Sequence, residues 1–261
     1  MSQGKHILIT GTTSGIGLGI LRAYHAMGWQ ITAVNRRKDR ELEASFPDVE
    51  FLHFDVRDYK AVENYFEEAN RIKQLPSVYF LSAGINKVDN LGDFSTETFR
   101  EVLDVNLLGV LNFVGAALPY LKGQKAIFVA ASSTTNIFPN PNCLGYYVSK
   151  LGVYEMFRMM DRRYRVSGIR FKALILGPVA TNIFASGKLA SKIQAAVRDM
   201  ITVSVDDLVG PAIRFIHSSK QAWFFPKSSC ALFFALKVIN TIVPFYRGSA
   251  PAKAAGPPNP T

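Results

Sequence analysis

Cysteine and histidine are scarce in this chain, and their scarcity excludes two classes of protein. The 261 residues include 2 cysteines, Cys143 and Cys230, and no Cys-x-x-Cys pair. A disulfide framework is therefore not expected, and both thiols should be free in a reducing compartment. The 4 histidines are scattered without the spacing of metal ligands. We predict no metal site.

The sequence also lacks the marks of a secretory leader and of a P-loop. Residues 5–10 already have the pattern of a strand, with no charged stretch and long apolar run before them, so we expect a cytoplasmic protein. No Gly-Lys-Ser or Gly-Lys-Thr occurs, which excludes the P-loop. No internal repeat or second domain is visible. We predict one catalytic domain over residues 1–227.

Acidic residues are fewer than basic ones, 20 against 30, which gives a formal net charge of +10. No basic face with interleaved aromatic residues and no nucleic-acid-reading module is visible, so nucleic acid is not a predicted partner. Four explanations remain open: a solvated basic surface, an anionic cofactor, acidic carrier groups, or an anionic membrane surface.

A glycine-rich turn follows the first predicted strand. Residues 11–17 read Gly-Thr-Thr-Ser-Gly-Ile-Gly, and residues 18–27 have a helical pattern. A strand, a glycine-rich turn and a helix in this order form the setting of a dinucleotide site, because glycine lets the backbone approach a pyrophosphate at the positive end of the helix. The predicted pyrophosphate-binding residues are Gly11, Thr13, Ser14, Gly15, Ile16 and Gly17.

The end of the second predicted strand, residues 31–34, indicates which dinucleotide is preferred. An NAD site of this kind has an acidic residue about 20 positions after the glycines. Here that position is Asn35, and Arg36 and Arg37 follow it. Guanidinium groups bind a 2′-phosphate that a carboxylate would repel. The sequence therefore predicts NADP(H) rather than NAD.

Alternating strand and helix patterns continue along the chain and predict an α/β fold with a parallel sheet. Ligands of such sheets lie at the carboxyl ends of the strands. Asp55 follows the third strand and either braces that turn or accepts from the adenine amino group. Asn106 lies in an apolar helix and is either a hydrogen-bonded structural residue or a placed polar group. The further predicted strands are residues 49–54, 77–82, 124–131, 169–176 and 221–225, and the further helices are residues 59–73, 96–121 and 206–218.

Tyr146 and Lys150 are four residues apart on a predicted helix and therefore share one face. An ammonium group beside a phenol favours the phenolate and so lowers the pKa of the tyrosine. Tyr147 has Leu151 at the same spacing and lacks such a partner. The pair is a candidate proton donor to a carbonyl.

The segments that would shape a substrate pocket are less regular. Residues 136–144 contain two prolines and predict a stiff pocket wall, and residues 182–202 have the pattern of an amphipathic lid. The apolar residues 228–247 are too short and interrupted to span a membrane. They either pack on protein or lie in a membrane interface as a peripheral contact. Residues 248–261, rich in Pro, Ala and Gly, predict a disordered tail.

Several motifs occur together in one order. They are Thr10-Gly11-x-x-x-Gly15-Ile16-Gly17, Ser82-Ala83-Gly84, Asn106, Ser133, Tyr146-x-x-x-Lys150 and Gly177-x-Val179-x-Thr181. This set resembles the short-chain dehydrogenase/reductase family, in its compact single-domain branch, over roughly residues 5 to 225. The sequence departs from the family pattern at Leu81 and Ser82, where the usual residues are asparagines, and at Leu176, where the usual residue is proline.

The resemblance implies a Rossmann-like, doubly wound parallel sheet of about seven strands with helices on both faces. It implies a catalytic group of Asn106, Ser133, Tyr146 and Lys150. In the mechanism it implies, Ser133 and Tyr146 hold the carbonyl oxygen, Lys150 lowers the tyrosine pKa and holds the nicotinamide ribose, and Asn106 places a water. Besides the glycine-rich turn, Asn35, Arg36 and Arg37, the resemblance implies further cofactor-binding residues. These are Asp55, Val56, Ala83, Gly84, Tyr146, Lys150, Val179 and Thr181.

The expected function is therefore an NADP(H)-dependent oxidoreductase that interconverts a carbonyl and an alcohol on a hydrophobic, lipid-like small molecule. One alternative keeps the enzyme but makes the substrate an acyl group linked to CoA or a carrier protein. Another, of a different class, is an NADP-binding sensor or structural protein without turnover. The family expectation for assembly is a homodimer or higher homo-oligomer through the two long helices.

Overall fold

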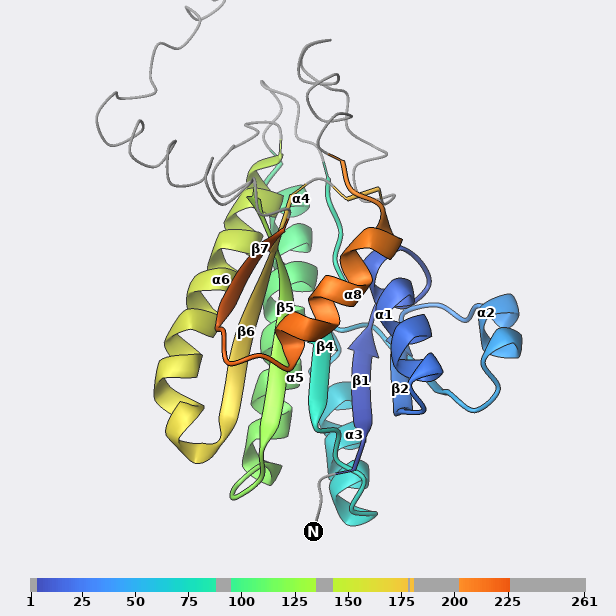
Figure 1. Ribbon diagram of the computed structural model, residues 1–261. Helices are drawn as coiled ribbons and strands as arrows, with labels where there is room; N and C mark the ends of the chain where they lie inside the picture. The colour runs from blue at the N-terminus through green and yellow to red at the C-terminus, as the bar shows by residue number, and fades with distance from the viewer. Residues whose placement is uncertain (1–3, 88–94, 135–142, 178, 181–201, 226–261) are drawn as a thin grey trace, which may run out of the picture.

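The computed structural model describes residues 4–87, 95–134, 143–177, 179–180 and 202–225. Within them a parallel sheet has the order β3-β2-β1-β4-β5-β6-β7 (Figure 1). This order reverses between β1 and β4, which is where ligands bind in doubly wound folds. The predicted fold class is confirmed. The strands are β1 (His6–Thr10), β2 (Gln30–Asn35), β3 (Glu50–His53), β4 (Val78–Leu81), β5 (Ala126–Ser133), β6 (Ile169–Leu176) and β7 (Ala222–Phe225).

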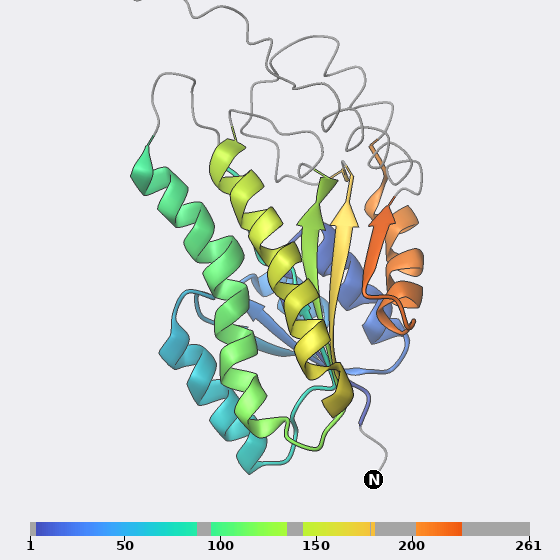
Figure 2. The same cartoon turned by 90° about the vertical axis from the view of Figure 1, so that its left-hand side faces the viewer.

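Helices cover both faces of the sheet, as Figure 2 shows from the side. One face carries α1 (Gly15–Ala26) and α8 (Val205–Ile216), which are in contact. The other carries α3 (Tyr59–Arg71) and two long helical segments. The first segment consists of α4 (Thr96–Leu103), η1 (Asp104–Leu108), α5 (Gly109–Ala117) and η2 (Leu118–Tyr120), and the second of α6 (Leu144–Tyr164) and η5 (Arg165–Ser167). Helix α3 contacts α5, and α4 contacts α6.

Strand β1 shows why the strands are apolar on both faces. All five of its residues are buried. Leu8 packs in the core under α3, α5 and α6, whereas Ile7 and Ile9 pack in the core under α1 and α8. Successive side chains of a strand point to opposite faces, and a parallel sheet is covered on both. The apolar runs of the sequence therefore follow from this two-sided burial.

The helix predicted over residues 96–121 is not a regular α-helix. Its middle part, Asp104–Leu108, is a π-helix that contains Asn106. The whole stretch Thr96–Tyr120 is long and apolar enough to cross a membrane by composition alone, but 50% of its apolar window is buried inside the protein. Its packing against α3 and α6 accounts for that apolarity.

Two further features were not predicted. A short helix, α2 (Arg40–Ser45), begins at Asp39, whose carboxylate accepts a hydrogen bond from the Leu42 backbone N–H at 3.1 Å. Lys172 lies fully buried in the middle of β6. Its Nζ donates to the carbonyl oxygens of Phe215, Ile216 and Ser218, at 2.8, 2.9 and 2.5 Å, and so caps the carboxyl end of α8.

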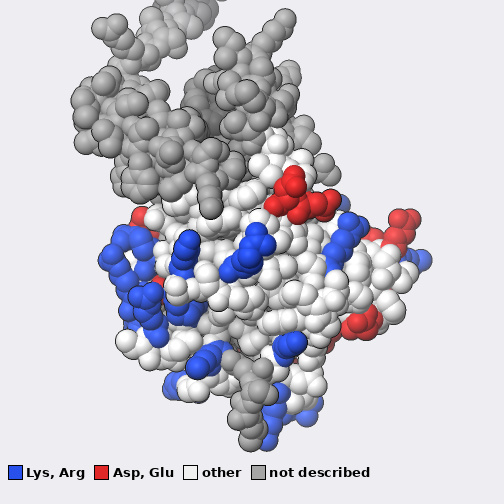
Figure 3. Space-filling model, in the orientation of Figure 1, with Lys and Arg blue, Asp and Glu red and all other residues white. Residues whose placement is uncertain are grey.

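Lys and Arg side chains gather at the end of α6, at the lower left of Figure 3. They include Arg162 and Arg163 in the last turn of the helix and Arg165 just after it. Arg165 precedes Ile169, which pairs with Ala126 at the amino ends of β5 and β6. This basic patch therefore lies at the end of the sheet opposite the carboxyl ends of the strands.

Several predicted segments lie outside the described residues. They are Thr181, nearly all of the predicted pocket wall (residues 136–144) and lid (residues 182–202), the apolar stretch of residues 228–247 and the tail of residues 248–261. Whether residues 228–247 contact protein or membrane stays a prediction.

Candidate active site

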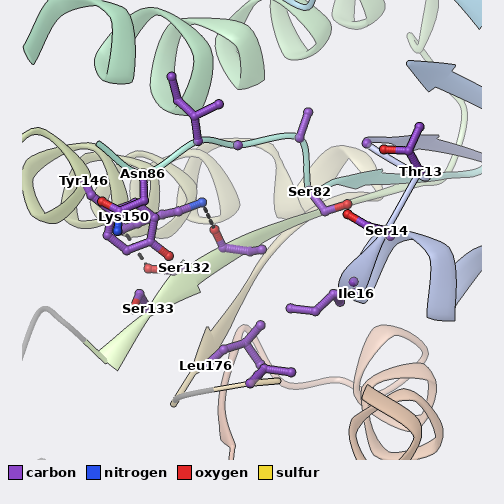
Figure 4. Close-up of a pocket in the computed structure, with 18 of the residues that line it drawn as sticks. Thr13, Ser14, Ile16, Ser82, Asn86, Ser132, Ser133, Tyr146, Lys150 and Leu176 are labelled. Atoms are coloured by element: carbon purple, nitrogen blue, oxygen red, sulfur yellow. Dashed lines mark hydrogen bonds between the residues drawn. The ribbon is translucent and has the colours of Figure 1, made fainter. Parts of the chain in front are cut away.

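A cavity of about 460 Å³ opens at the carboxyl ends of β1, β4, β5 and β6 (Figure 4). Thr13, Ser14 and Ile16 lie at one end of it, and Tyr146, Lys150 and Ser133 lie at the other. The structure thus brings the predicted dinucleotide turn and the predicted catalytic residues to one cavity. Its lining residues are Gly11, Thr13, Ser14, Gly15, Ile16, Gly17, Ser82, Ala83, Gly84, Ile85, Asn86, Ala131, Ser132, Ser133, Tyr146, Lys150, Leu176, Gly177 and Val179.

Backbone segments pack so closely at two glycines of the glycine-rich turn that a larger residue would collide with them. Gly11 has a φ of 76°, and a Cβ added to it would lie 2.9 Å from the Cα of Ala83. A Cβ added to Gly17 would lie 2.0 Å from the Gly11 carbonyl oxygen. Glycine is therefore required at both positions, and the backbone of the turn lies directly on the cavity, as a pyrophosphate site needs.

Asn35, at the end of β2, holds this turn in place. Its Oδ1 accepts from the Thr12 backbone N–H at 2.8 Å, and its Nδ2 donates to the Thr12 hydroxyl at 2.8 Å. The side chain is buried and does not line the cavity. The structure therefore gives Asn35 a supporting role in the turn, which its position in the sequence did not reveal.

The predicted adenosine residues lie outside the cavity lining. Asp55 forms an ion pair with Arg57, with 2.8 Å between Oδ2 and Nη2. This hydrogen-bonded guanidinium lowers the pKa of the Asp55 carboxyl, and the charge of Arg36 lowers it further. Of the two alternatives for Asp55, the structure shows the brace of the turn. Arg36 and Arg37 are exposed, while Val56 is buried against α5, where its carbonyl accepts from Asn112 at 2.9 Å.

Tyr146 and Lys150 lie on the first two turns of α6 and face the cavity, as their spacing predicts. The Lys150 Nζ is 5.5 Å from the centre of the Tyr146 ring and donates to the Ala131 carbonyl at 2.9 Å. A hydrogen bond joins the side chains of Tyr146 and Ser133. The candidate catalytic hydroxyls and the ammonium group are therefore together at the ends of β5 and α6.

Burial dominates the titration of this pair. It raises the pKa of Tyr146 to about 12, although the hydrogen bond with Ser133 opposes the shift. It also lowers the pKa of Lys150 to about 8. The pKa of Tyr146 is therefore not lowered as predicted, because desolvation of the phenolate is the largest cause of its shift. Tyr146 is consequently a protonated phenol at neutral pH, suited to donate a proton.

Asn106 is a hydrogen-bonded residue of the π-helix, 1% exposed. Its Oδ1 accepts from the Ile85 backbone N–H at 2.8 Å, and its Nδ2 donates to the Ile85 carbonyl at 2.9 Å and to the Ser149 hydroxyl at 3.1 Å. Both amide protons are used, while Oδ1 can accept one further hydrogen bond, so the water expected beside Asn106 stays a prediction. Asn106 therefore positions the segment after β4 against α6.

Two hydroxyls near the catalytic pair, those of Ser132 and Ser149, had no role predicted from the sequence, and the structure gives each a partner. The Ser132 hydroxyl donates to the Lys150 carbonyl at 2.9 Å, and the Ser149 hydroxyl donates to the Tyr146 carbonyl at 2.8 Å. The first bond fixes α6 against the end of β5, and the second lies within α6. Ser133, rather than Ser132, contacts the Tyr146 side chain. The serine beside Tyr146 is thus the one that the family resemblance implies.

A nicotinamide dinucleotide fits these residues. Gly11 and Gly17 line one end of the cavity with bare backbone, and Gly84 lines it beside Lys150, where an added Cβ would lie 3.6 Å from Nζ. Among the described residues only the Ala131 carbonyl accepts from Lys150 Nζ. Two ammonium protons are therefore left for a ligand such as a ribose hydroxyl.

Comparison with known proteins supports what the geometry shows. The family model described as short chain dehydrogenase matches residues 5–191. The chain belongs to this family and is an oxidoreductase that acts on CH–OH or C=O groups. The predicted family is confirmed.

Individual relatives are distant. The chain is 27% identical to the 3beta-hydroxysteroid dehydrogenase 1 of Eggerthella lenta, over 76% of this chain and 80% of the relative. It is 26% identical to the NADPH-dependent 3-dehydrocapnine reductase of Ornithobacterium rhinotracheale, over 70% and 69%. A short chain dehydrogenase from Burkholderia cenocepacia, solved with NADP, shares the fold with a TM-score of 0.74 at 18% identity, over 92% and 97% of the two chains.

Proposed function

We propose that this protein reduces a ketone or aldehyde on a hydrophobic small molecule to the alcohol, with NADPH as the hydride donor. The observation that carries the proposal is the protonated, buried Tyr146, hydrogen-bonded to Ser133 at one end of a cavity whose other end is the glycine-rich turn. A tyrosine whose pKa is raised to about 12 is protonated at neutral pH and can supply the proton that reduction of a carbonyl requires.

When bound, the cofactor supplies the hydride to the carbonyl carbon. The Ser133 and Tyr146 hydroxyls hold the carbonyl oxygen, and Tyr146 transfers its proton to that oxygen as negative charge develops. Lys150 holds the nicotinamide ribose with its remaining ammonium protons, and its charge stabilises the phenolate that is left behind. Gly11 to Gly17 hold the pyrophosphate.

Two observations support NADPH as the cofactor and a hydrophobic substrate. Arg36 and Arg37 are exposed beside the glycine-rich turn, where a 2′-phosphate would lie. The Asp55 carboxylate, on which the charge of Arg36 acts, is already paired with Arg57. The cavity wall includes the apolar side chains of Ile16, Ile85, Leu176 and Val179. The names of the two relatives, a hydroxysteroid dehydrogenase and an NADPH-dependent reductase, agree with this proposal.

The basic patch does not favour a substrate linked to CoA or to an acidic carrier. The patch lies at the amino ends of the strands, whereas the cavity opens at their carboxyl ends. A carrier docked on the patch would hold its acyl group at the end of the sheet opposite the cavity.

The test is to mix the protein with NADPH and a panel of hydrophobic ketones and aldehydes, and to follow the absorbance of the reduced cofactor. We expect oxidation of NADPH by the wild type and a loss of about 10²–10⁴-fold in kcat for Tyr146→Phe, with the affinity for NADPH unchanged. Tyr147→Phe is the matched control and should keep its activity. Turnover retained by Tyr146→Phe, or none by the wild type with any carbonyl, would refute the proposal.

A further inference from the structure

Asn86 is a polar side chain of the cavity that the mechanism above does not use. It lines the cavity and is 9% exposed. Both of its amide atoms, Oδ1 and Nδ2, are buried and have no hydrogen-bond partner among the described residues. The other side chains with such atoms, His6, Tyr65 and Tyr79, do not line the cavity. Native folds rarely leave a buried amide unpaired, and one that faces a binding site is suited to a ligand.

The path of the backbone shows which part of the cavity Asn86 serves. Ser82 and Ala83 lie against the glycine-rich turn, since Cβ atoms added to Gly17 and Gly11 would meet them at 2.9 Å. The next residue, Gly84, lies beside Lys150 Nζ, and Ile85 packs against the cluster that contains Tyr146.

Each step of the chain thus leads away from the dinucleotide turn and toward the catalytic pair. Asn86 is the following residue, and Figure 4 shows it at the same end of the cavity as Tyr146 and Lys150. It therefore serves the catalytic end of the cavity rather than the pyrophosphate end.

Asn86 is also held in a fixed position from both sides. The peptide groups of Ile85, the residue before it, are bound by Asn106 at 2.8 and 2.9 Å. Lys87, the residue after it, forms an ion pair with Glu101 of α4. A side chain on so short and anchored a segment is preorganised, which reduces the entropy lost on binding.

We infer that Asn86 binds a second oxygen of the substrate, close to the carbonyl that is reduced. The inference rests on the proposed function, in which Ser133 and Tyr146 hold the reacting oxygen. An amide offers one acceptor and two donors, which suits a carbonyl or a hydroxyl group. The substrate class is therefore a carbonyl compound with another carbonyl or hydroxyl within a few bonds of the first, rather than a simple ketone.

The test compares pentan-2-one, pentane-2,3-dione and pentane-2,4-dione as substrates of the wild type and of Asn86→Leu, which has a similar volume and no amide. For the better dione, we expect its kcat/KM relative to that of pentan-2-one to fall about tenfold in the variant, as for one lost hydrogen bond. The kcat/KM for pentan-2-one should change less than about twofold. The intrinsic reactivity of the diones cancels, because only the change in the ratio is read. Asn70→Leu, the same substitution on the exposed side of α3, should leave the ratio unchanged.

Three results would overturn the inference alone, and a fourth would overturn it together with the proposed function. An unchanged ratio in an active Asn86→Leu variant shows that no substrate oxygen is bound there. Equal losses with all three carbonyls, together with a raised KM for NADPH, show that Asn86 binds the cofactor. Thermal midpoints well below that of the wild type in both Asn86→Leu and Asn86→Ala show a structural role instead. Wild-type protein that binds NADPH but reduces none of the three carbonyls contradicts the proposed function, and the inference with it.

Discussion

Burial changes the pKa values of individual residues at this site and so decides which of them carry a proton. Tyr146 and Lys150 are both at most 5% exposed, and desolvation moves their pKa values toward the neutral forms, to about 12 and about 8. The phenol is therefore a stable proton donor, whereas the ammonium group loses its proton only about one pH unit above neutrality. The electrostatic cost of this arrangement is measurable in stability.

The cost of burying the Lys150 charge predicts how stability depends on pH. Its pKa is lowered from 10.5 to about 8 in the folded protein, so between these values the unfolded chain binds more protons and the free energy of unfolding rises with pH. The free energy of unfolding of the wild type, minus that of Lys150→Met, should increase by about 2 kcal/mol from pH 7.5 to pH 10. Urea unfolding of protein purified without cofactor measures this difference. Lys172, also buried, is common to both proteins and cancels. A difference that is flat or falls with pH contradicts the burial argument.

Arg36 predicts the choice between the two nicotinamide dinucleotides. A charge-assisted hydrogen bond to a 2′-phosphate contributes about 1.5–3 kcal/mol. Arg36→Ala should therefore raise the KM for NADPH by about tenfold or more and leave the KM for NADH nearly unchanged. Arg22→Ala, an exposed arginine of α1, is the control for a general loss of positive charge. Equal effects on both cofactors would show that Arg36 does not contact the 2′-phosphate.

At the scale of elements, the active site is a junction of β4, β5, α6 and the π-helix. Asn106 connects the segment after β4 to α6, and Ser132 connects β5 to α6. The π-helix adds a residue to the turn that carries Asn106, and such insertions occur often at functional sites. Catalytic geometry is thus set by hydrogen bonds between elements rather than within them.

Removing the Asn106 side chain should affect stability and activity together. Asn106→Ala leaves the Ile85 N–H and carbonyl unpaired, and we expect the free energy of unfolding to fall by about 1–3 kcal/mol. We expect kcat to fall as well, because Ile85 packs against the cluster that contains Tyr146. Asn112→Ala breaks one hydrogen bond to Val56, on the same helical stretch but away from the cavity. It should lose stability with little loss of kcat. Urea unfolding and steady-state kinetics measure both, and a kcat preserved in Asn106→Ala would contradict the positioning role.

At the scale of the whole molecule, three leucines of the described residues are exposed close to one another. Leu108, Leu111 and Leu151 are 45%, 41% and 36% exposed. They lie on neighbouring helices, since a Cβ added to Gly152 of α6 would meet the Leu107 side chain at 3.2 Å. Exposed leucines grouped on two adjacent helices are typical of a protein interface. A second copy of this chain is the occupant that the family expectation favours.

We expect the wild type to be a dimer or larger assembly, and Leu111→Glu combined with Leu151→Glu to be monomeric, because two carboxylates on each subunit would have to be desolvated in the interface. Size-exclusion chromatography with light scattering measures the mass. Val166→Glu, at a residue 91% exposed and just beyond α6, should not change it. A wild-type monomer, or a double variant of unchanged mass, contradicts the assignment of this surface.

Much of this fold and site follows from the sequence because the signals are local. The run of residues 11–17 predicts a glycine-rich turn, and the structure places that turn on the cavity. The contact between Gly17 and the Gly11 carbonyl, which requires glycine, lies within one βα unit. The spacing of Tyr146 and Lys150 places them on one helical face wherever the helix lies. The two-sided burial of parallel strands likewise follows from runs of apolar residues.

The remaining features were decided by tertiary structure, because they depend on which distant segments meet and how far water is excluded. Asn35 turns to Thr12 and Asn106 to Ile85, partners that no local pattern names. The direction in which the Tyr146 pKa shifts depends on the balance of burial and charge, which spacing alone cannot give. An unpaired amide such as that of Asn86 exists only once every neighbour has taken its place in the fold.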